Sequence, residues 1–231
     1  MNIKAVGFDV GNTLITYSVP LNWQALYPSA IKQVMAACGL DYSAQADAQA
    51  QAILTKYNTR VNYREHEVSS DTIFGEILDG WDMEICKLQV AKQAFYSYFQ
   101  RQSACYDDAE HVLLSLKSRG IKLGVLTDVA YGMDNEYALQ DLVAIRKYID
   151  ICLTSTDVGY RKPHKKGYLM LQEEFDTPSS TIAFVGDEEK DIVGANNVGF
   201  ISILKSYVDR DWGQNHTIRD LSELLPLVDN L

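Results

Sequence analysis

The sequence Phe8-Asp9-Val10-Gly11-Asn12-Thr13-Leu14 follows an apolar run at residues 3–8. The run predicts a buried β-strand, and the glycine and asparagine after it predict a tight turn. Asp9 therefore stands at the carboxyl end of a strand, where open α/β sheets place their ligands. A second apolar run, within residues 181–191, again ends in acidic residues. The sequence thus predicts two strand-end carboxylate groups that are far apart along the chain.

Hydrophobic periodicity divides the chain into two kinds of sequence. After residue 105, predicted strands (121–127, 149–154, 181–186, 200–204) alternate with predicted helices (107–120, 134–147, 165–175, 190–197), and a short last helix begins near Asp220 with Pro226 near its end. This alternation indicates a parallel sheet with helices on both faces. Residues from about 17 to 104 instead show helical spacing almost throughout. We therefore predict a doubly wound α/β domain, residues 1–16 and 105–231, that carries a helical insertion at residues 17–104.

Composition excludes several classes of protein. The 231 residues carry a net charge of −10, which argues against the basic surface needed for non-specific nucleic-acid binding. No apolar segment is long enough for a membrane span, and the chain enters a strand with no leader, so we expect a cytoplasmic protein that binds no membrane. The four cysteines lack metal-site spacing and are expected to be free thiols in a reducing compartment.

Four predicted strands are each followed by reactive side chains. Asp9 follows the first strand, residues 127–128 follow the second, Lys162 follows the third, and Asp187 and Asp191 follow the fourth. Taken singly, each has a structural explanation, because strand-end aspartates often cap helices or form turns. If the strands are parallel, however, all of these residues lie at one edge of the sheet. Their convergence predicts a metal or phosphoryl site.

These segments resemble the motifs of the haloacid dehalogenase-like hydrolase superfamily, in the family's order and over nearly the whole chain. The segments are Asp9-Val10-Gly11-Asn12-Thr13-Leu14, the strand that ends at Thr127, Arg161-Lys162-Pro163-His164, and Val185-Gly186-Asp187 with Asp191. The resemblance implies a phosphatase-type enzyme whose helical insertion is a cap over the active site. It also implies that the partner is a small phosphorylated metabolite.

The resemblance implies a role for each residue at the sheet edge. Asp9 would attack phosphorus and form an aspartyl-phosphate, a route open to carboxylates. Lys162 would hold the phosphate as a point charge, and Thr127 would donate hydrogen bonds to a phosphate oxygen. The predicted substrate-binding residues are Asn12, Thr13, Thr127, Asp128 and Lys162. Asp128 also has a second interpretation, as a solvated loop charge like Asp157, Glu188 and Glu189.

A Mg²⁺ ion is the cofactor that the resemblance implies. Its ligands would be Asp9, Asp187 and the backbone carbonyl of Gly11, because Mg²⁺ prefers oxygen ligands in octahedral geometry. Asp191 would support this metal site or orient Lys162. The intact pair of acids late in the chain favours metal-assisted phosphoryl chemistry over dehalogenation.

Gly11 departs from the family's phosphatase pattern. Phosphatases of the family have a second aspartate at this position, which protonates the leaving oxygen and then activates water. Glycine cannot transfer a proton, and general acid–base catalysis typically contributes about 10²–10⁴-fold. We therefore predict slow hydrolysis of a phosphomonoester, with a surrogate acid from the insertion (Glu65, His66 or Glu67) or from water.

Gly11 also keeps other functions open. One alternative is a catalytically weakened member of the superfamily that binds a phosphorylated metabolite or a protein partner. Another is a phosphonate or haloacid hydrolase. The sequence does not decide whether the aromatic residues of the insertion line the cleft or the core; these are Tyr17, Trp23, Tyr27, Tyr57 and Tyr63.

Overall fold

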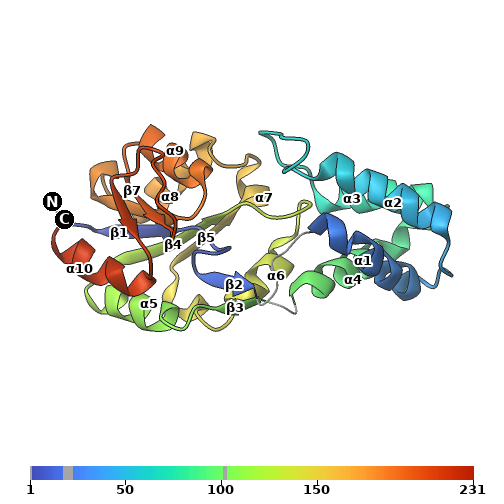
Figure 1. The fold of residues 1–231 in the computed structure, drawn as a ribbon, viewed down its shortest axis with the longest axis horizontal. Coiled ribbons are helices and arrows are strands. Elements are labelled where there is room, and N and C mark those ends of the chain that lie inside the picture. Colours follow the sequence, from blue (N-terminus) through green and yellow to red (C-terminus); the bar gives the residue numbers. More distant parts are fainter. Residues whose placement is uncertain (1, 18–22, 101–102) are drawn as a thin grey trace.

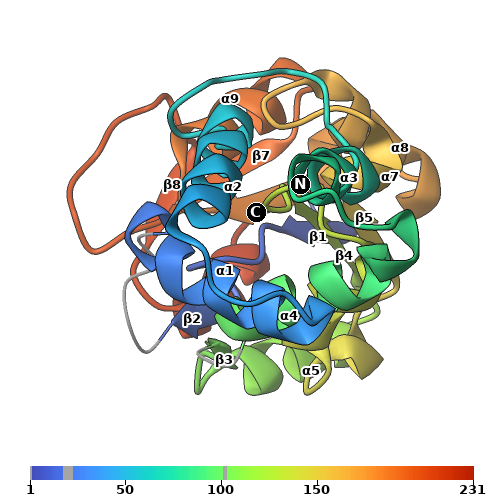
Figure 2. The same cartoon turned by 90° about the vertical axis from the view of Figure 1, so that its right-hand side faces the viewer.

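The computed structural model describes residues 2–17, 23–100 and 103–231. Figure 1 shows a sheet flanked by helices at one end of the molecule and a body made of helices alone at the other. Figure 2 looks at the molecule from the side of this helical body, with the sheet behind it. Both chain termini lie at the end of the molecule far from this helical body.

The central sheet has six parallel strands in the order β5-β4-β1-β6-β7-β8. The strands are β1 (Ala5–Phe8), β4 (Lys122–Thr127), β5 (Ile151–Thr154), β6 (Ile182–Gly186), β7 (Ile201–Lys205) and β8 (His216–Ile218). β1 lies in the middle, paired with β4 and β6. The strand order of the sheet reverses at β1, and doubly wound sheets bind their ligands at such a reversal point. The predicted doubly wound α/β fold is confirmed.

Helices cover both faces of the sheet. They are α5 (Ala109–Ser118), α7 (Ser155–Val158), α8 (Lys165–Phe175), α9 (Glu189–Asn197) and α10 (Leu224–Asp229). Buried residues of α5 and α10 pack with Val6 and Phe8 of β1 in one core cluster. Buried residues of α8 and α9 form a second cluster with Ala5 and strand β6. Alternate residues of β1 thus enter different cores, as the two-residue period of a strand requires.

The helical body consists of α1 (Trp23–Cys38), α2 (Ala44–Tyr57), α3 (Ser70–Gly80) and α4 (Leu88–Gln100), with a short 3₁₀ helix, η1 (Ile85–Lys87), before α4. Ser43 and Ser69 cap α2 and α3, because each side chain accepts a backbone N–H of the first turn. The four helices share a core cluster that is separate from those of the sheet. Within the described residues, no helix combines the length and the apolar composition that crossing a membrane requires.

The structure corrects the predicted helix at residues 134–147. Only α6 (Asn135–Ala138) is α-helical, and short 3₁₀ helices, η2 (Leu139–Leu142) and η3 (Arg146–Tyr148), follow it. Tyr137 packs into the helical body, whereas Leu142 and Ile145 pack against the sheet. One straight helix cannot serve two cores in different directions. The segment instead breaks into short turns between the two parts of the molecule.

Two further corrections concern short elements. The antiparallel pair β2 (Ile15–Tyr17) and β3 (Ser103–Cys105) was not predicted from the sequence. It joins the two ends of the helical insertion. The last helix begins after a 3₁₀ turn, η5 (Leu221–Glu223), and Pro226 lies in its first turn rather than near its end. Proline fits there because first-turn N–H groups have no partner within the helix.

Candidate active site

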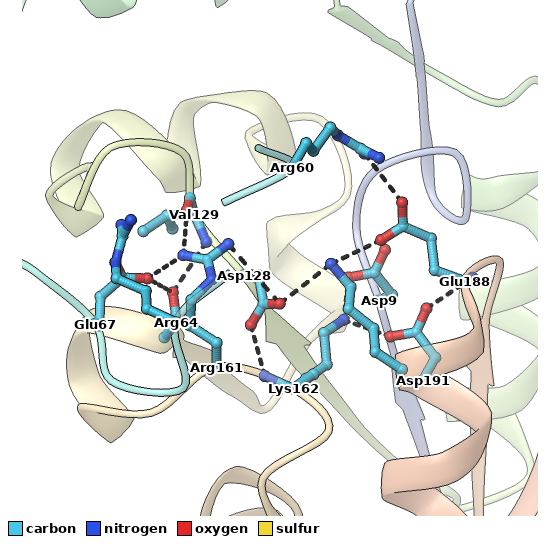
Figure 3. A network of polar contacts seen from close by, with 12 residues as sticks. Asp9, Arg60, Arg64, Glu67, Asp128, Val129, Arg161, Lys162, Glu188 and Asp191 are labelled. Carbon is cyan, nitrogen blue, oxygen red and sulfur yellow. Dashed lines mark hydrogen bonds and ion pairs between the residues drawn. The ribbon is translucent and has the colours of Figure 1, made fainter. Parts of the chain in front are cut away.

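Lys162 and two aspartates form the buried centre of the site (Figure 3). The Lys162 ammonium lies 2.5 Å from Asp9 Oδ1 and 2.6 Å from Asp191 Oδ1, and it also donates to the Leu126 carbonyl at 3.2 Å. Burial by itself would lower the pKa of Lys162, but the Asp191, Asp9 and Asp128 carboxylates outweigh burial and raise it well above its ordinary value. Lys162 is therefore a fixed positive charge beside Asp9.

Asp187 completes a cluster of acids at the carboxyl ends of β1 and β6. One oxygen each of Asp9, Asp187 and Asp191 lie within 4.8 Å of one another. Burial, with Asp9, Asp191 and Glu188 adding to it, raises the pKa of Asp187 to about 7. Burial and Asp9 raise the pKa of Asp191 to about 6 against the opposing effect of Lys162. The cluster thus holds more negative charge than Lys162 balances.

This cluster fits a divalent cation. Asp191 Oδ2 accepts the N–H of Glu188 at 3.0 Å while Oδ1 faces Lys162, so both of its oxygens are already engaged. The Asp187 carboxylate, by contrast, has no hydrogen bond or ion pair with any residue that the structure describes. Crowded carboxylates with raised pKa values are stabilised by a bound Mg²⁺, which takes oxygen ligands. Asp9 and Asp187 are the carboxylates best placed to hold it.

Asp128 is not a solvated loop charge, which corrects one of its two interpretations. Its side chain is 5% exposed and accepts the Lys162 N–H at 3.0 Å, while Lys190 Nζ lies 3.1 Å away. Although burial opposes it, Lys190, Lys162 and Arg161 lower the pKa of Asp128. The side chain is committed to protein cations rather than exposed to a substrate.

Glu188 is likewise paired rather than solvated. Lys190 Nζ lies 2.7 Å from Glu188 Oε2, and Arg60 Nη2 lies 3.0 Å from Glu188 Oε1. Burial opposes these cations, but Lys190 and Arg60 hold the pKa of Glu188 at about 2. Arg60 belongs to the loop between α2 and α3, so this ion pair connects the helical body with the sheet edge. Figure 3 shows Arg60 reaching over the strand ends to Glu188.

The remaining predicted substrate-binding residues lie near the sheet edge, with different access. Thr127 ends β4, beside β1, and is partly exposed. Asn12 is exposed, with a left-handed φ of 55°, and its carbonyl accepts a hydrogen bond from Lys205 at 3.0 Å. Thr13 is fully buried, and its hydroxyl has no partner among the described residues. In this arrangement a substrate does not reach the Thr13 hydroxyl.

Glu67 forms a second connection between the helical body and the sheet. Its side chain is 2% exposed and pairs with Arg161, and it accepts hydrogen bonds from Ser155 Oγ at 2.6 Å and from Arg64 at 3.1 Å. Both carboxylate oxygens are therefore occupied (Figure 3). This pairing argues against Glu67 as the surrogate acid.

The other two candidate acids of the insertion lie beside the loop that follows β5. The His66 ring contacts the Tyr160 ring, with centroids 4.6 Å apart. Glu65 Oε1 lies 4.0 Å from His164 Nε2. Neither side chain has a hydrogen bond or ion pair with Asp9 within the described part of the chain. None of the three predicted candidates, Glu65, His66 and Glu67, therefore places an acid at the nucleophile in this arrangement.

Sequence reasoning missed Arg60, Lys190 and Arg161. Lys190 and Arg161 stand inside the recognised motifs, but a surface cation and a paired cation look alike in sequence. Arg60 lies in a loop 128 positions from its partner Glu188. One feature of the sequence could have indicated these cations: the last motif has an excess of acids, and buried acids require cations nearby.

Comparison with known proteins identifies relatives of this chain. The family model of the haloacid dehalogenase-like hydrolases matches residues 3–199. The ribulose-1,5-bisphosphate 5-phosphatase of Halopiger xanaduensis is 28% identical over 148 residues, which are 58% of this chain and 61% of that protein. The glyceraldehyde 3-phosphate phosphatase of Methanocaldococcus jannaschii is 27% identical over 238 residues, which cover 99% and 98% of the two chains.

Solved structures share the fold. A HAD phosphatase from Thermococcus onnurineus superposes with a TM-score of 0.67 at 23% identity, covering 98% of each chain. A 2-haloacid dehalogenase from Pseudomonas syringae superposes with a TM-score of 0.71 at 21% identity, covering 99% of this chain and 98% of the other. Because both phosphatases and dehalogenases have this fold, the chemistry has to be argued from the side chains of the site.

Proposed function

The chain belongs to the haloacid dehalogenase-like hydrolase family and is an enzyme of its phosphatase type, and we propose that it hydrolyses a small phosphomonoester through an aspartyl-phosphate on Asp9 with Mg²⁺. The observation that carries this proposal is the cluster of Asp9, Asp187 and Asp191 around a buried lysine. A dehalogenase would have no use for a cluster in which Asp9 raises the pKa values of both Asp187 and Asp191. A site that binds Mg²⁺ and phosphate needs such a cluster of carboxylates.

The proposed reaction has two steps. A carboxylate oxygen of Asp9 attacks phosphorus, the bond from phosphorus to the leaving oxygen breaks, and that oxygen takes the electron pair. Lys162, held 2.5 Å from Asp9, neutralises charge on the phosphoryl oxygens, and Thr127 donates hydrogen bonds to them. Water then attacks the aspartyl-phosphate, which releases inorganic phosphate and restores Asp9. Positioning and charge neutralisation supply most of the catalysis in such transfers.

The proposed metal ligands are Asp9, Asp187 and the Gly11 carbonyl, with Asp191 acting through Lys162. When bound, Mg²⁺ supplies charge stabilisation to the phosphoryl oxygens in the transition state. Asp191 positions the lysine ammonium, 2.6 Å away, and so fixes the distance between the nucleophile and the phosphate-binding charge.

The helical insertion, residues 17–104, is the proposed cap domain over this site. Its loop between α2 and α3 reaches the sheet edge through Arg60 and Glu67, which fits a role in closing the site and selecting the substrate. The proposed partner is a small phosphorylated metabolite, as the names of the phosphatase relatives suggest. A cytoplasmic location remains an expectation from the sequence.

Gly11 supports one competing proposal, a weakened enzyme that mainly binds a phosphorylated ligand. The two proposals differ in turnover, which an activated aryl phosphate measures well because its leaving group needs little protonation. We expect hydrolysis of nitrophenyl phosphate in the presence of Mg²⁺ and its loss with a chelator. Asp9→Asn should reduce the rate by at least about 10⁴-fold, because it removes the nucleophile.

The matched control is Asp107→Asn, which removes an exposed carboxylate and should leave the rate unchanged. Circular dichroism of both variants checks that the fold is retained. If the parent protein gives no Mg²⁺-dependent turnover, or Asp9→Asn keeps it, the proposed function is wrong.

A further inference from the structure

A tyrosine occupies the space next to the missing side chain at position 11. An ideal Cβ atom built on Gly11 would lie 3.7 Å from the Tyr17 hydroxyl oxygen and 3.9 Å from the ring atom Cε2. These are ordinary van der Waals distances. Apart from the adjacent residues of the loop, no other described atom comes within 4 Å of that position. The carboxyl group of an aspartate at position 11 would therefore share this space with the phenol.

The backbone brings Tyr17 to this place. The Val10 carbonyl accepts the N–H groups of Leu14 and Ile15, both at 2.9 Å, and so turns the chain back over the nucleophile loop. β2 then pairs with β3, where Tyr17 faces Ser103. Ile15 and Tyr17 lie on the same face of β2 because side chains alternate along a strand. Since Ile15 is fully buried in the sheet core, Tyr17 is directed towards the core domain as well.

The Tyr17 hydroxyl is available as a hydrogen-bond donor. Among the residues that the structure describes, none accepts a hydrogen bond from this hydroxyl and none donates one to it. Burial, with Asp141, Asp9 and Asp187 adding to it, raises the pKa of Tyr17 above its ordinary value. The phenol therefore stays protonated over the physiological pH range. The influence of Asp9 and Asp187 also places this hydroxyl in the electric field of the acid cluster.

We propose that Tyr17 takes over part of the role of the missing acid at position 11, by donating a hydrogen bond to the leaving oxygen of the phosphomonoester. This inference rests on the proposed function. When the phosphorus–oxygen bond breaks, the leaving oxygen takes the electron pair and the Tyr17 O–H stabilises the developing charge. Solvent supplies the proton that completes the alcohol, and the water that hydrolyses the aspartyl-phosphate returns one to solvent. A protonated phenol cannot activate that water, so Tyr17 assists the first step only.

Tyr17→Phe tests this role because it removes the hydroxyl and keeps the ring that packs against the core. With phenyl phosphate, whose leaving oxygen is basic, we expect kcat/KM to fall by about 10²-fold, as for loss of one transition-state hydrogen-bond donor. With nitrophenyl phosphate, which leaves easily, the fall should stay within about threefold, since little charge develops that needs stabilising. The dependence of rate on leaving-group basicity should therefore become steeper.

Tyr148→Phe is the matched control. Tyr148 also packs against the sheet core, and its hydroxyl donates to Glu110 at 2.9 Å. Tyr148→Phe therefore removes a hydroxyl elsewhere on the core, and the rates of this variant should match those of the parent for both substrates. An equal loss on both substrates in Tyr17→Phe would assign Tyr17 a structural role and overturn the inference, as would no loss on either. A parent without Mg²⁺-dependent turnover would instead overturn the proposed function and this inference with it.

Discussion

The two sides of the candidate active site differ in charge. The charged side comprises Asp9, Lys162, Asp187 and Asp191, and the neutral side comprises Gly11 and Tyr17. On the charged side, two ion-pair distances of 2.5 and 2.6 Å fix the lysine between carboxylates. On the neutral side, the nearest described atom to a Cβ at position 11, apart from the adjacent residues of the loop, is a phenol oxygen at 3.7 Å.

This difference separates the two halves of the proposed reaction. Forming an aspartyl-phosphate needs a nucleophile and neutralised charge, and the charged side supplies both. Hydrolysing it benefits from a general base, and the neutral side has none. We therefore expect the second step to limit turnover. The predictions below test each side separately.

Of the variants that compare the two sides, Lys162→Met should have the largest effect, because it removes the only lysine that contacts both Asp9 and Asp191 in the described part of the chain. We expect loss of about 10³-fold in kcat/KM from missing charge stabilisation. We also expect a decrease of about 3–5 kcal/mol in the free energy of unfolding, since buried carboxylates lose their partner. Aryl phosphate hydrolysis and urea denaturation measure the two effects.

Lys165→Met is the control for this prediction, because Lys165 is exposed at the start of α8. It should change both quantities little. A Lys162→Met variant as stable as Lys165→Met would mean that the two carboxylates do not depend on the lysine. The charged side would then not be the coupled unit described above.

Mg²⁺ binding should depend strongly on pH, with protons as competitors. The pKa of Asp187 is raised from 3.8 to about 7, and that of Asp191 from 3.8 to about 6. Between pH 3.8 and about pH 7, the folded protein therefore binds more protons than the unfolded chain. Without metal, stability should therefore fall as pH rises from about 4 to 7. Mg²⁺ binds the deprotonated carboxylates, so its affinity should rise by up to about tenfold per pH unit over the upper part of this range.

Thermal unfolding with and without Mg²⁺, at pH 5.5 and 7.5, checks this expectation without any assay of activity. The stabilisation by Mg²⁺ should be larger at the higher pH. Asp187→Asn should remove both the stabilisation and its pH dependence. Equal stabilisation at the two pH values would contradict the assignment of the acid cluster as the metal site.

The charged side was more predictable from sequence than the neutral side, for a physical reason. Parallel strands end at one edge of a sheet, so an acid or lysine after each apolar run is brought to that edge by topology alone. Tyr17 reaches Gly11 only because a loop turns back and β2 pairs with β3. Neither event leaves a periodic pattern in the sequence. The Glu67–Arg161 pair, 94 positions apart, was unpredictable for the same reason.

Gly11→Asp should have the smallest effect and tests the neutral side directly. Gly11 does not have the left-handed φ that only glycine readily adopts, and a Cβ fits there, so the variant should fold with a stability change within about 1 kcal/mol. The new carboxylate can transfer protons, which the phenol cannot do for water. Because Tyr17 already occupies the adjacent space, we expect a gain of only about tenfold, below the usual contribution of about 10²–10⁴-fold.

The gain in kcat/KM for Gly11→Asp should be greater for phenyl phosphate than for nitrophenyl phosphate, because kcat/KM reports the first step, in which the poorer leaving group needs the proton more. Gly11→Asn is the matched control, since it has nearly the same shape and no acid, and it should give no gain with either substrate. If the asparagine variant gained as much as the aspartate variant, the benefit would come from displacing Tyr17 rather than from proton transfer. The tyrosine would then hinder the reaction rather than assist it, which would contradict the role proposed for Tyr17.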